Sequence, residues 1–302
     1  MALLTIITPT YNRANLLSNL YYSLEKQQDH DFEWLIVDDG SKDKTKKVIK
    51  TIKTNATFPI HYICKSNGGK HTAINYGINL IQTELTMIVD SDDLLLEDAV
   101  SNIKAIHEKY KSNKSIGAYS FLRCYSNGKV IVELDNNEFL ESYVKYRIKR
   151  NIKGDMAEVF KTEILKKFHF PEFKGEKFLS EDVLWIQIGL RYLFVFINKA
   201  IYQCEYINGG LTDQDKIMKF ASPLGMMMRG KMLMNKECGI IANIKGAIIY
   251  NCYNFQRIIK FKAKDSRLAL SFRESVFCFF TLLVFCFFYA KWYLKTKNKN
   301  KT

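Results

Sequence analysis

Short apolar runs alternate with amphipathic stretches over the first 110 residues. The apolar runs predict strands at Leu3–Thr8, Trp34–Val37, Ile60–Cys64 and Leu85–Val89. The stretches between and after them predict helices at Asn15–Gln27, Lys42–Ile52, Thr72–Ile81 and Glu97–Tyr110. The strand runs are almost continuously apolar, which is typical of strands covered by helices on both faces. This alternation predicts an α/β fold with a mostly parallel sheet and helices on both of its faces.

The longest apolar run lies close to the C-terminus, at Val276–Ala290, and it continues past Lys291 to Leu294. A helix of fifteen residues is roughly 22 Å long and one of nineteen roughly 28 Å, whereas the hydrocarbon core of a membrane is about 30 Å thick. A shallow insertion therefore fits this run better than a full span. The alternative is a helix that packs inside the protein.

Composition agrees with one large globular domain, or one with a smaller appendage, because 47% of the 302 residues are hydrophobic and 14% are aromatic. Seven cysteines form no CxxC pair, which favours a reducing cytosol over a disulfide framework or a structural zinc site. The first residues lack the layout of a signal peptide, and we expect a cytoplasmic protein.

Most of the net charge of +14 belongs to the C-terminal region. Residues 257–302 hold eleven Lys or Arg and two acidic residues, a net charge of +9, which leaves +5 for the rest. Because these cations border an apolar run, they favour the anionic inner face of the cell membrane over nucleic acid. We therefore expect a helical, membrane-associating C-terminal segment and a peripheral association with that membrane.

Polar clusters follow each predicted strand, at residues 8–13, 38–41, 66–71 and 90–93. Ligands of doubly wound sheets bind beyond the carboxyl ends of the strands, so these clusters are expected to share one site. Neither GxGxxG after the first strand nor GxxxxGK[ST] anywhere is present, which removes the main support for a dinucleotide-binding or P-loop protein.

The fourth cluster is acidic and contains Asp90, Ser91, Asp92 and Asp93. Carboxylates are the ligands that Mg²⁺ and Mn²⁺ prefer, so Asp90 and Asp92 predict a divalent-cation site. Asp93 is either a further ligand or a helix cap.

The other clusters suit a nucleotide. Asp38–Ser41 can accept hydrogen bonds from ribose hydroxyls or from the imide of uracil, or it forms a turn and a helix cap. Thr8 and Tyr11 can line a base pocket. Gly68–His71 offers backbone N–H groups and a cation to a pyrophosphate.

Two adjacent acids, Glu181 and Asp182, lie where a later helix is expected to begin, with Ser180 as its N-cap. One of them can act as a general base that takes a proton from a hydroxyl. Neighbouring helical side chains point about 100° apart, so only one can face a substrate. The sequence does not say which.

Together these motifs resemble family 2 glycosyltransferases with the GT-A, Rossmann-like fold, over about residues 1–215. The residues that carry the resemblance are Thr8–Arg13, Val37–Ser41, Asp90–Asp92 and Glu181–Asp182. Gly154–Glu158 and residues 204–212 are similar to bacterial members that build surface polysaccharides. The resemblance implies a GT-A domain at 1–215 and a helical C-terminal region at 216–302.

The resemblance also implies an inverting transfer from a nucleotide-activated sugar, usually a UDP-sugar, assisted by Mn²⁺ or Mg²⁺. It assigns nucleotide-sugar binding to Thr8, Pro9, Tyr11, Arg13, Asp39, Lys70, His71, Asp90 and Ser91. It assigns the metal to Asp92 with Asp90 and Asp93, and the base to Asp182, with Glu181 as second choice.

The expected acceptor is an oligosaccharide or a lipid-linked saccharide in the synthesis of a bacterial capsule or cell surface. Two alternatives stay open at this point: a nucleotidyltransferase, and a non-catalytic, membrane-docked module that binds nucleotide sugars. Transfer and hydrolysis assays with UDP-sugars, with and without Mn²⁺, separate the three.

Overall fold

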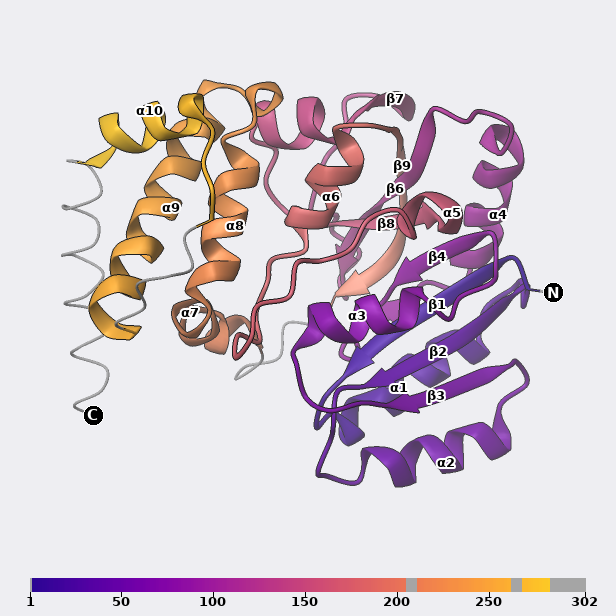
Figure 1. Cartoon of the computed structure of the whole chain (residues 1–302). Coiled ribbons are helices and arrows are strands. Elements are labelled where there is room, and N and C mark those ends of the chain that lie inside the picture. The colour runs from indigo at the N-terminus through magenta and orange to yellow at the C-terminus, as the bar shows by residue number, and fades with distance from the viewer. Residues whose placement is uncertain (1, 205–210, 262–267, 283–302) are drawn as a thin grey trace.

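The computed structural model describes residues 2–204, 211–261 and 268–282, and it contains one nine-stranded sheet (Figure 1). The strand order is β3-β2-β1-β4-β8-β6-β9-β5, and β7 pairs with β9. The strands are β1 (Leu4–Thr10), β2 (Phe32–Asp38), β3 (Ile60–Cys64), β4 (Leu85–Ile88), β5 (Leu94–Leu95), β6 (Ile116–Tyr125), β7 (Glu138–Ser142), β8 (Met156–Lys161) and β9 (Leu193–Cys204).

Helices cover both faces of the sheet, as predicted. They are α1 (Ala14–Glu25), α2 (Thr45–Asn55), α3 (Lys70–Ile78), α4 (Ala99–Tyr110), α5 (Thr162–Leu165), α6 (Asp182–Gly189) and the π-helix η1 (Val144–Lys149). In β1, Leu4 and Ile6 pack in the core beneath α1, α2 and α4, whereas Ile7 packs in the core beneath α3 and α6. This alternation along one strand explains why the run is apolar throughout.

The prediction of a mostly parallel sheet holds for β1 to β4 and is wrong for the second half. β3, β2, β1 and β4 pair in parallel, but β8 enters antiparallel to both β4 and β6. β9 is parallel to β6 and antiparallel to β5 and β7. Between β6 and β8 the chain runs along β7, antiparallel to β6, and then returns through η1 before β8 begins.

The C-terminal region is helical, with α7 (Leu211–Ala221), α8 (Pro223–Leu233), η2 (Lys236–Cys238), α9 (Ile240–Phe261) and α10 (Phe272–Phe280). The predicted boundary between residues 215 and 216 lies within α7. α8 and α9 lie side by side (Figure 1) and approach closely at two glycines, since a Cβ on Gly230 would lie 2.7 Å from the backbone oxygen of Gly246.

No helix within the described ranges is long and apolar enough to cross a membrane. The predicted apolar run at 276–294 begins in α10, and its part from residue 283 lies outside the described residues, as do the lysines after it. α10 begins at a capping box in which the Ser271 hydroxyl accepts from the Glu274 backbone N–H.

Candidate active site

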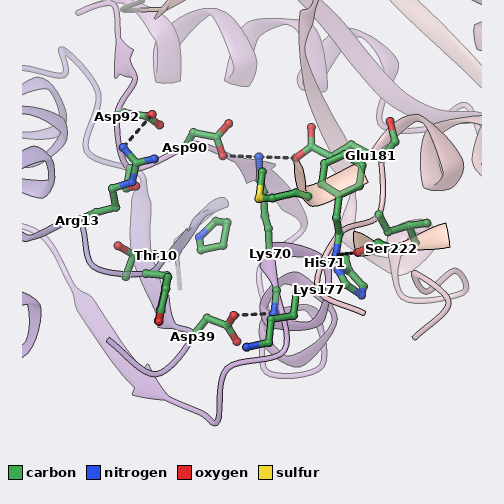
Figure 2. A pocket seen from close by; sticks show the side chains of 18 of the residues that line it. Thr10, Arg13, Asp39, Lys70, His71, Asp90, Asp92, Lys177, Glu181 and Ser222 are labelled. Atoms are coloured by element: carbon green, nitrogen blue, oxygen red, sulfur yellow. Dashed lines mark hydrogen bonds and ion pairs between the residues drawn. The ribbon is translucent and has the colours of Figure 1, made fainter. Parts of the chain in front are cut away.

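One cavity of about 1250 Å³ opens at the carboxyl ends of β1, β2 and β4 and is closed on its other side by residues of α6, α7 and α8. Most of the residues predicted from the sequence line it: Pro9, Tyr11, Arg13, Asp39, Lys70, His71, Asp90, Ser91, Asp92, Glu181 and Asp182. Figure 2 shows part of this set, with Arg13, Asp39, Lys70, His71, Asp90, Asp92 and Glu181 labelled. The four clusters that follow the strands therefore meet the later acidic pair across a single space.

Thr8 is not among the residues that line this cavity, and its expected place beside a base stays a prediction. β1 continues through Thr10, and Thr8 is a fully buried residue within it. The Trp34 indole Nε1 donates a hydrogen bond of 2.9 Å to the Thr8 hydroxyl. Thr8 thus fixes the packing between β1 and β2, while Pro9 and Thr10 line the cavity.

The acidic cluster after β4 brings three carboxylates together. One oxygen from each of Asp90, Asp92 and Asp93 lies within 4.8 Å of the others. Arg13 contacts Asp92 at 3.6 Å, and the Tyr202 hydroxyl donates to Asp93 at 2.7 Å. Three hard oxygen donors at this spacing fit Mg²⁺ or Mn²⁺.

The close approach of these acids to one another changes their pKa values. Burial and the neighbouring Asp90 raise the pKa of Asp93 to about 6, and the same two causes raise the pKa of Asp92. For Asp90, burial is opposed and outweighed by the Lys70 ammonium and by Arg123 and Arg13, so its pKa is lowered. A divalent cation would offset the mutual repulsion of the three groups.

Lys70 links the acidic cluster to the far side of the cavity (Figure 2). Its Nζ lies 2.5 Å from an Asp90 oxygen and 2.7 Å from a Glu181 oxygen. These two carboxylates raise the pKa of Lys70 against the opposing effect of burial. Lys70 is the first residue of α3, which begins two residues earlier than the sequence predicts.

Gly69 precedes this helix and has a positive φ of 96°. A Cβ there would lie 2.0 Å from the backbone oxygen of Lys177, so the chain around residue 177 packs directly on the start of α3. Only glycine fits both the conformation and the contact.

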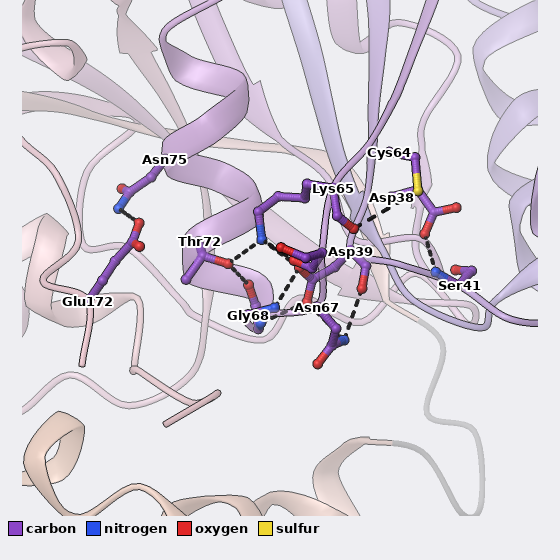
Figure 3. A network of polar contacts seen from close by, with 12 residues as sticks. Asp38, Asp39, Ser41, Cys64, Lys65, Asn67, Gly68, Thr72, Asn75 and Glu172 are labelled. Atoms are coloured by element: carbon purple, nitrogen blue, oxygen red, sulfur yellow. Dashed lines mark hydrogen bonds and ion pairs between the residues drawn. The ribbon is translucent and has the colours of Figure 1, made fainter. Parts of the chain in front are cut away.

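Asp39 is fully hydrogen-bonded by the loop between β3 and α3 (Figure 3). Its oxygens accept from Lys65 Nζ at 2.8 Å, Gly68 N at 2.9 Å, Gly69 N at 2.7 Å and the Asn67 side-chain amide at 3.1 Å. A carboxylate has about four acceptor positions, so this loop occupies all of them. Asp39 therefore holds the loop that presents Lys70, and its contact with a base stays a prediction.

His71 is buried beside Asp39, and its ring meets Phe170 edge to face at 6.4 Å. Burial lowers the pKa of His71, which favours the neutral ring. Its Nδ1 has no hydrogen-bond partner among the residues that the structure describes, and the residue lines the cavity.

The acidic pair begins α6, although Ser180 is not its cap. The N-cap is Glu181, and the Ser180 backbone oxygen accepts from Val183 N. Asp182 is held by Arg229 of α8, whose Nε lies 2.8 and 3.0 Å from the two carboxylate oxygens and whose Nη2 lies 2.7 Å from one of them. Asp182 thus pairs with the C-terminal region, whereas Glu181 pairs with Lys70.

The cavity is also lined by charged residues to which sequence reasoning assigned no role, among them Arg123, Arg147, Glu158 and Arg229. Burial, aided by Asp155 and Glu181 and opposed by Arg123 and Arg147, raises the pKa of Glu158 to about 7. Glu158 belongs to the segment Gly154–Glu158, which the sequence analysis related to bacterial family members without giving any of its residues a role. No signal in the sequence pairs Arg229 with Asp182, which lies 47 positions away.

The sequence is similar to that of known proteins. The profile of Glycosyl transferase family 2 matches residues 5–163. The uncharacterized glycosyltransferase MG060 of Mycoplasma genitalium is 32% identical over 197 residues, 62% of this chain and 60% of that protein. The GalNAc(5)-diNAcBac-PP-undecaprenol beta-1,3-glucosyltransferase of Campylobacter jejuni is 28% identical over 66% of this chain and 63% of that protein. The chain thus spans about three fifths of the length of these two relatives.

Two solved structures show a similar fold at low identity. S. aureus TarS in complex with UDP-GlcNAc has a TM-score of 0.64 at 18% identity and covers 94% of this chain and 80% of that one. The mannosyltransferase PcManGT of Pyrobaculum calidifontis, in complex with GDP-Man and Mn²⁺, has a TM-score of 0.55 at 16% identity and covers 96% and 82%. The profile match covers more than half of the residues, and we conclude that this chain belongs to glycosyl transferase family 2.

Proposed function

We propose that this protein transfers a sugar, with inversion, from a nucleotide-sugar donor to a hydroxyl of a saccharide acceptor. The observation that carries the proposal is the convergence of the strand-end clusters and the acidic pair on one cavity. Its volume of about 1250 Å³ exceeds the roughly 300–1,000 Å³ of a typical small-molecule site, which gives room for a donor and part of an acceptor.

The proposed donor is a UDP-sugar, in keeping with UDP-GlcNAc in the structural relative from S. aureus. Asp90 and Asp92, with Asp93 as a further ligand, would hold Mn²⁺ or Mg²⁺, because their oxygens already lie close together. Such an ion supplies charge stabilisation to the departing diphosphate. Arg13 and Lys70 border the same acids and add positive charge for phosphate oxygens.

We assign the proton transfer to Asp182, which takes the proton of the acceptor hydroxyl as that oxygen attacks the anomeric carbon. Arg229 fixes the direction of this carboxylate through three contacts of 3.0 Å or less. Glu181 is the second choice, since Lys70 ties it to Asp90. Arg229 is accordingly a positioning residue.

The test separates donor binding from transfer. Binding of UDP-glucose and UDP-GlcNAc is measured by calorimetry with Mn²⁺, and transfer of radiolabelled sugar is measured into membrane lipids and oligosaccharides. Asp182→Asn is expected to bind donor normally and to lose transfer by about 100-fold or more. Glu181→Gln is the matched control and is expected to retain more activity.

Each alternative has its own outcome. Transfer that survives in Asp182→Asn but disappears in Glu181→Gln reverses the assignment of the base. Donor binding without transfer or hydrolysis identifies a binding module, and release of pyrophosphate from a nucleoside triphosphate identifies a nucleotidyltransferase. The family match favours sugar transfer over the last of these.

We further propose that the acceptor is lipid-linked, for capsule or cell-surface polysaccharide, and that the protein acts at the inner face of the cell membrane. The name of the C. jejuni relative includes a PP-undecaprenol acceptor. In α10, the side chains of Phe272, Phe279 and Phe280 are 73–87% exposed, which suits insertion between lipids.

Vesicle sedimentation tests the membrane proposal. We expect the full chain to bind vesicles with anionic lipids more than neutral ones, and Phe279→Ser with Phe280→Ser to weaken binding. Tyr22→Ser, an exposed aromatic of α1, is the control. Equal binding of the double variant and the wild type would show that α10 is not the contact.

A further inference from the structure

Arg147 is a buried cation with unused hydrogen-bond donors. It lies in η1, is 7% exposed and lines the cavity. Its Nη2 donates to the backbone oxygen of Gly154. Its Nε and Nη1 are buried and have no hydrogen-bond partner among the described residues. A guanidinium in this state is costly to bury, and an anion that entered the cavity would satisfy it.

The neighbours of Arg147 place it on the Asp182 side of the cavity. The helix that carries it, η1, contacts α9, and α9 packs against α8, which carries Arg229, the partner of Asp182. The cations with the largest effect on Asp90, in contrast, are Lys70, Arg123 and Arg13. Arg147 therefore belongs with the candidate base and not with the acids that would hold the donor diphosphate.

Glu158, a carboxylate whose pKa Arg147 lowers, offsets the charge of Arg147 only in part. Arg147 lowers the pKa of Glu158, but burial raises that pKa to about 7, so Glu158 carries only part of a charge at neutral pH. No ion pair joins Arg147 to an acid within the described residues.

The unpaired nitrogens distinguish Arg147 from the other cations of the cavity. Asp182, a carboxylate of the same cavity, is already paired with Arg229. Among the described cations that line the cavity, Arg147 is the one with two buried nitrogens that have no hydrogen-bond partner.

We propose that Arg147 binds an anionic group of the acceptor, a phosphate, and thereby selects acceptors that carry one near the reacting hydroxyl. This inference rests on the proposed sugar transfer. The donor diphosphate and an acceptor phosphate share the same chemistry, and the experiment must separate them. Two free guanidinium nitrogens can each donate a charge-assisted hydrogen bond to phosphate oxygens.

The test uses the full chain saturated with UDP and Mn²⁺, with glycerol 3-phosphate as the anionic probe and glycerol as its neutral counterpart. Calorimetry is expected to show binding of glycerol 3-phosphate but not of glycerol. Arg147→Met is expected to weaken that binding by about 10- to 100-fold and to leave UDP affinity unchanged. Arg150→Met, the same change at an exposed position just after η1, is the matched control.

Three outcomes overturn the proposal: displacement of glycerol 3-phosphate by UDP, a loss of UDP affinity in Arg147→Met, and equal binding of the two probes. Arg147→Lys keeps the charge with fewer donors and is expected to bind with intermediate affinity. If Arg147→Met does not fold, the proposal is still tested by Arg147→Lys and by the competition between UDP and glycerol 3-phosphate in the wild type. If the wild type does not bind UDP, that result counts against the proposed function. Binding of glycerol 3-phosphate measured in the absence of UDP then tests the role of Arg147 separately.

Discussion

Glu158 is expected to make the folded protein less stable as the pH rises. Its pKa is about 7 in the folded state, whereas an ordinary glutamate has 4.5. Between these values the folded protein holds a proton that the unfolded chain has released, so stability falls as pH increases through this window. At about 1.36 kcal/mol per pH unit, the full effect is about 3 kcal/mol above pH 7.

Glu158→Gln removes the ionisation and keeps the shape of the side chain. We expect the variant to be more stable than the wild type at pH 8, by up to about 3 kcal/mol, or roughly 5–10 °C in Tm. Near pH 4.5 the two proteins should differ little, because Glu158 is then protonated in the folded state and about half protonated in the unfolded chain.

The assay is thermal unfolding from pH 4.5 to 8.5, followed by circular dichroism, with the exposed Glu133→Gln as control. The difference in Tm between Glu158→Gln and the wild type should open between pH 5 and 7 and then stay constant. Two curves that run parallel over the whole range would refute the reasoning, and so would an equal effect of the control.

Lys70→Met should raise the pKa of Asp90, because this carboxylate loses its ammonium partner at 2.5 Å. An NMR titration of the aspartate carboxyls measures this pKa, and an unchanged value would contradict the prediction. Gly69→Ala should lower Tm by several degrees and weaken donor binding, because its Cβ would lie 2.0 Å from a backbone oxygen. Gly175→Ala, with a similar positive φ and nothing within 4 Å, should cost far less. Arg229→Met should reduce kcat for transfer about tenfold or more with unchanged donor affinity in calorimetry, and an unchanged kcat would argue against a positioning role.

The first half of the fold is predictable because its signals are local. Each of the first four strands is a largely apolar run with a polar cluster at its carboxyl end, and parallel strands bring such ends to one edge. The same geometry explains why Asp39, Lys70, Asp90 and Asp92 meet in one cavity.

The second half depends on contacts that no local pattern encodes. β8 runs antiparallel to β4, so residues at its beginning, not its end, reach the cavity. A search beyond the carboxyl ends of strands therefore passes over Glu158. The pairing of Asp182 with Arg229 and the four donors around Asp39 likewise depend on how distant segments pack.

The bridge from Asp90 through Lys70 to Glu181 also bears on how the protein is made. A chain under synthesis contains the acidic cluster well before Glu181 and Arg229 have been added. The cavity is complete only when α8 is in place, so a fragment that ends before Glu181 keeps the acids and lacks one side of the site. A ligand that contacts both sides would stabilise only chains that have folded through α8.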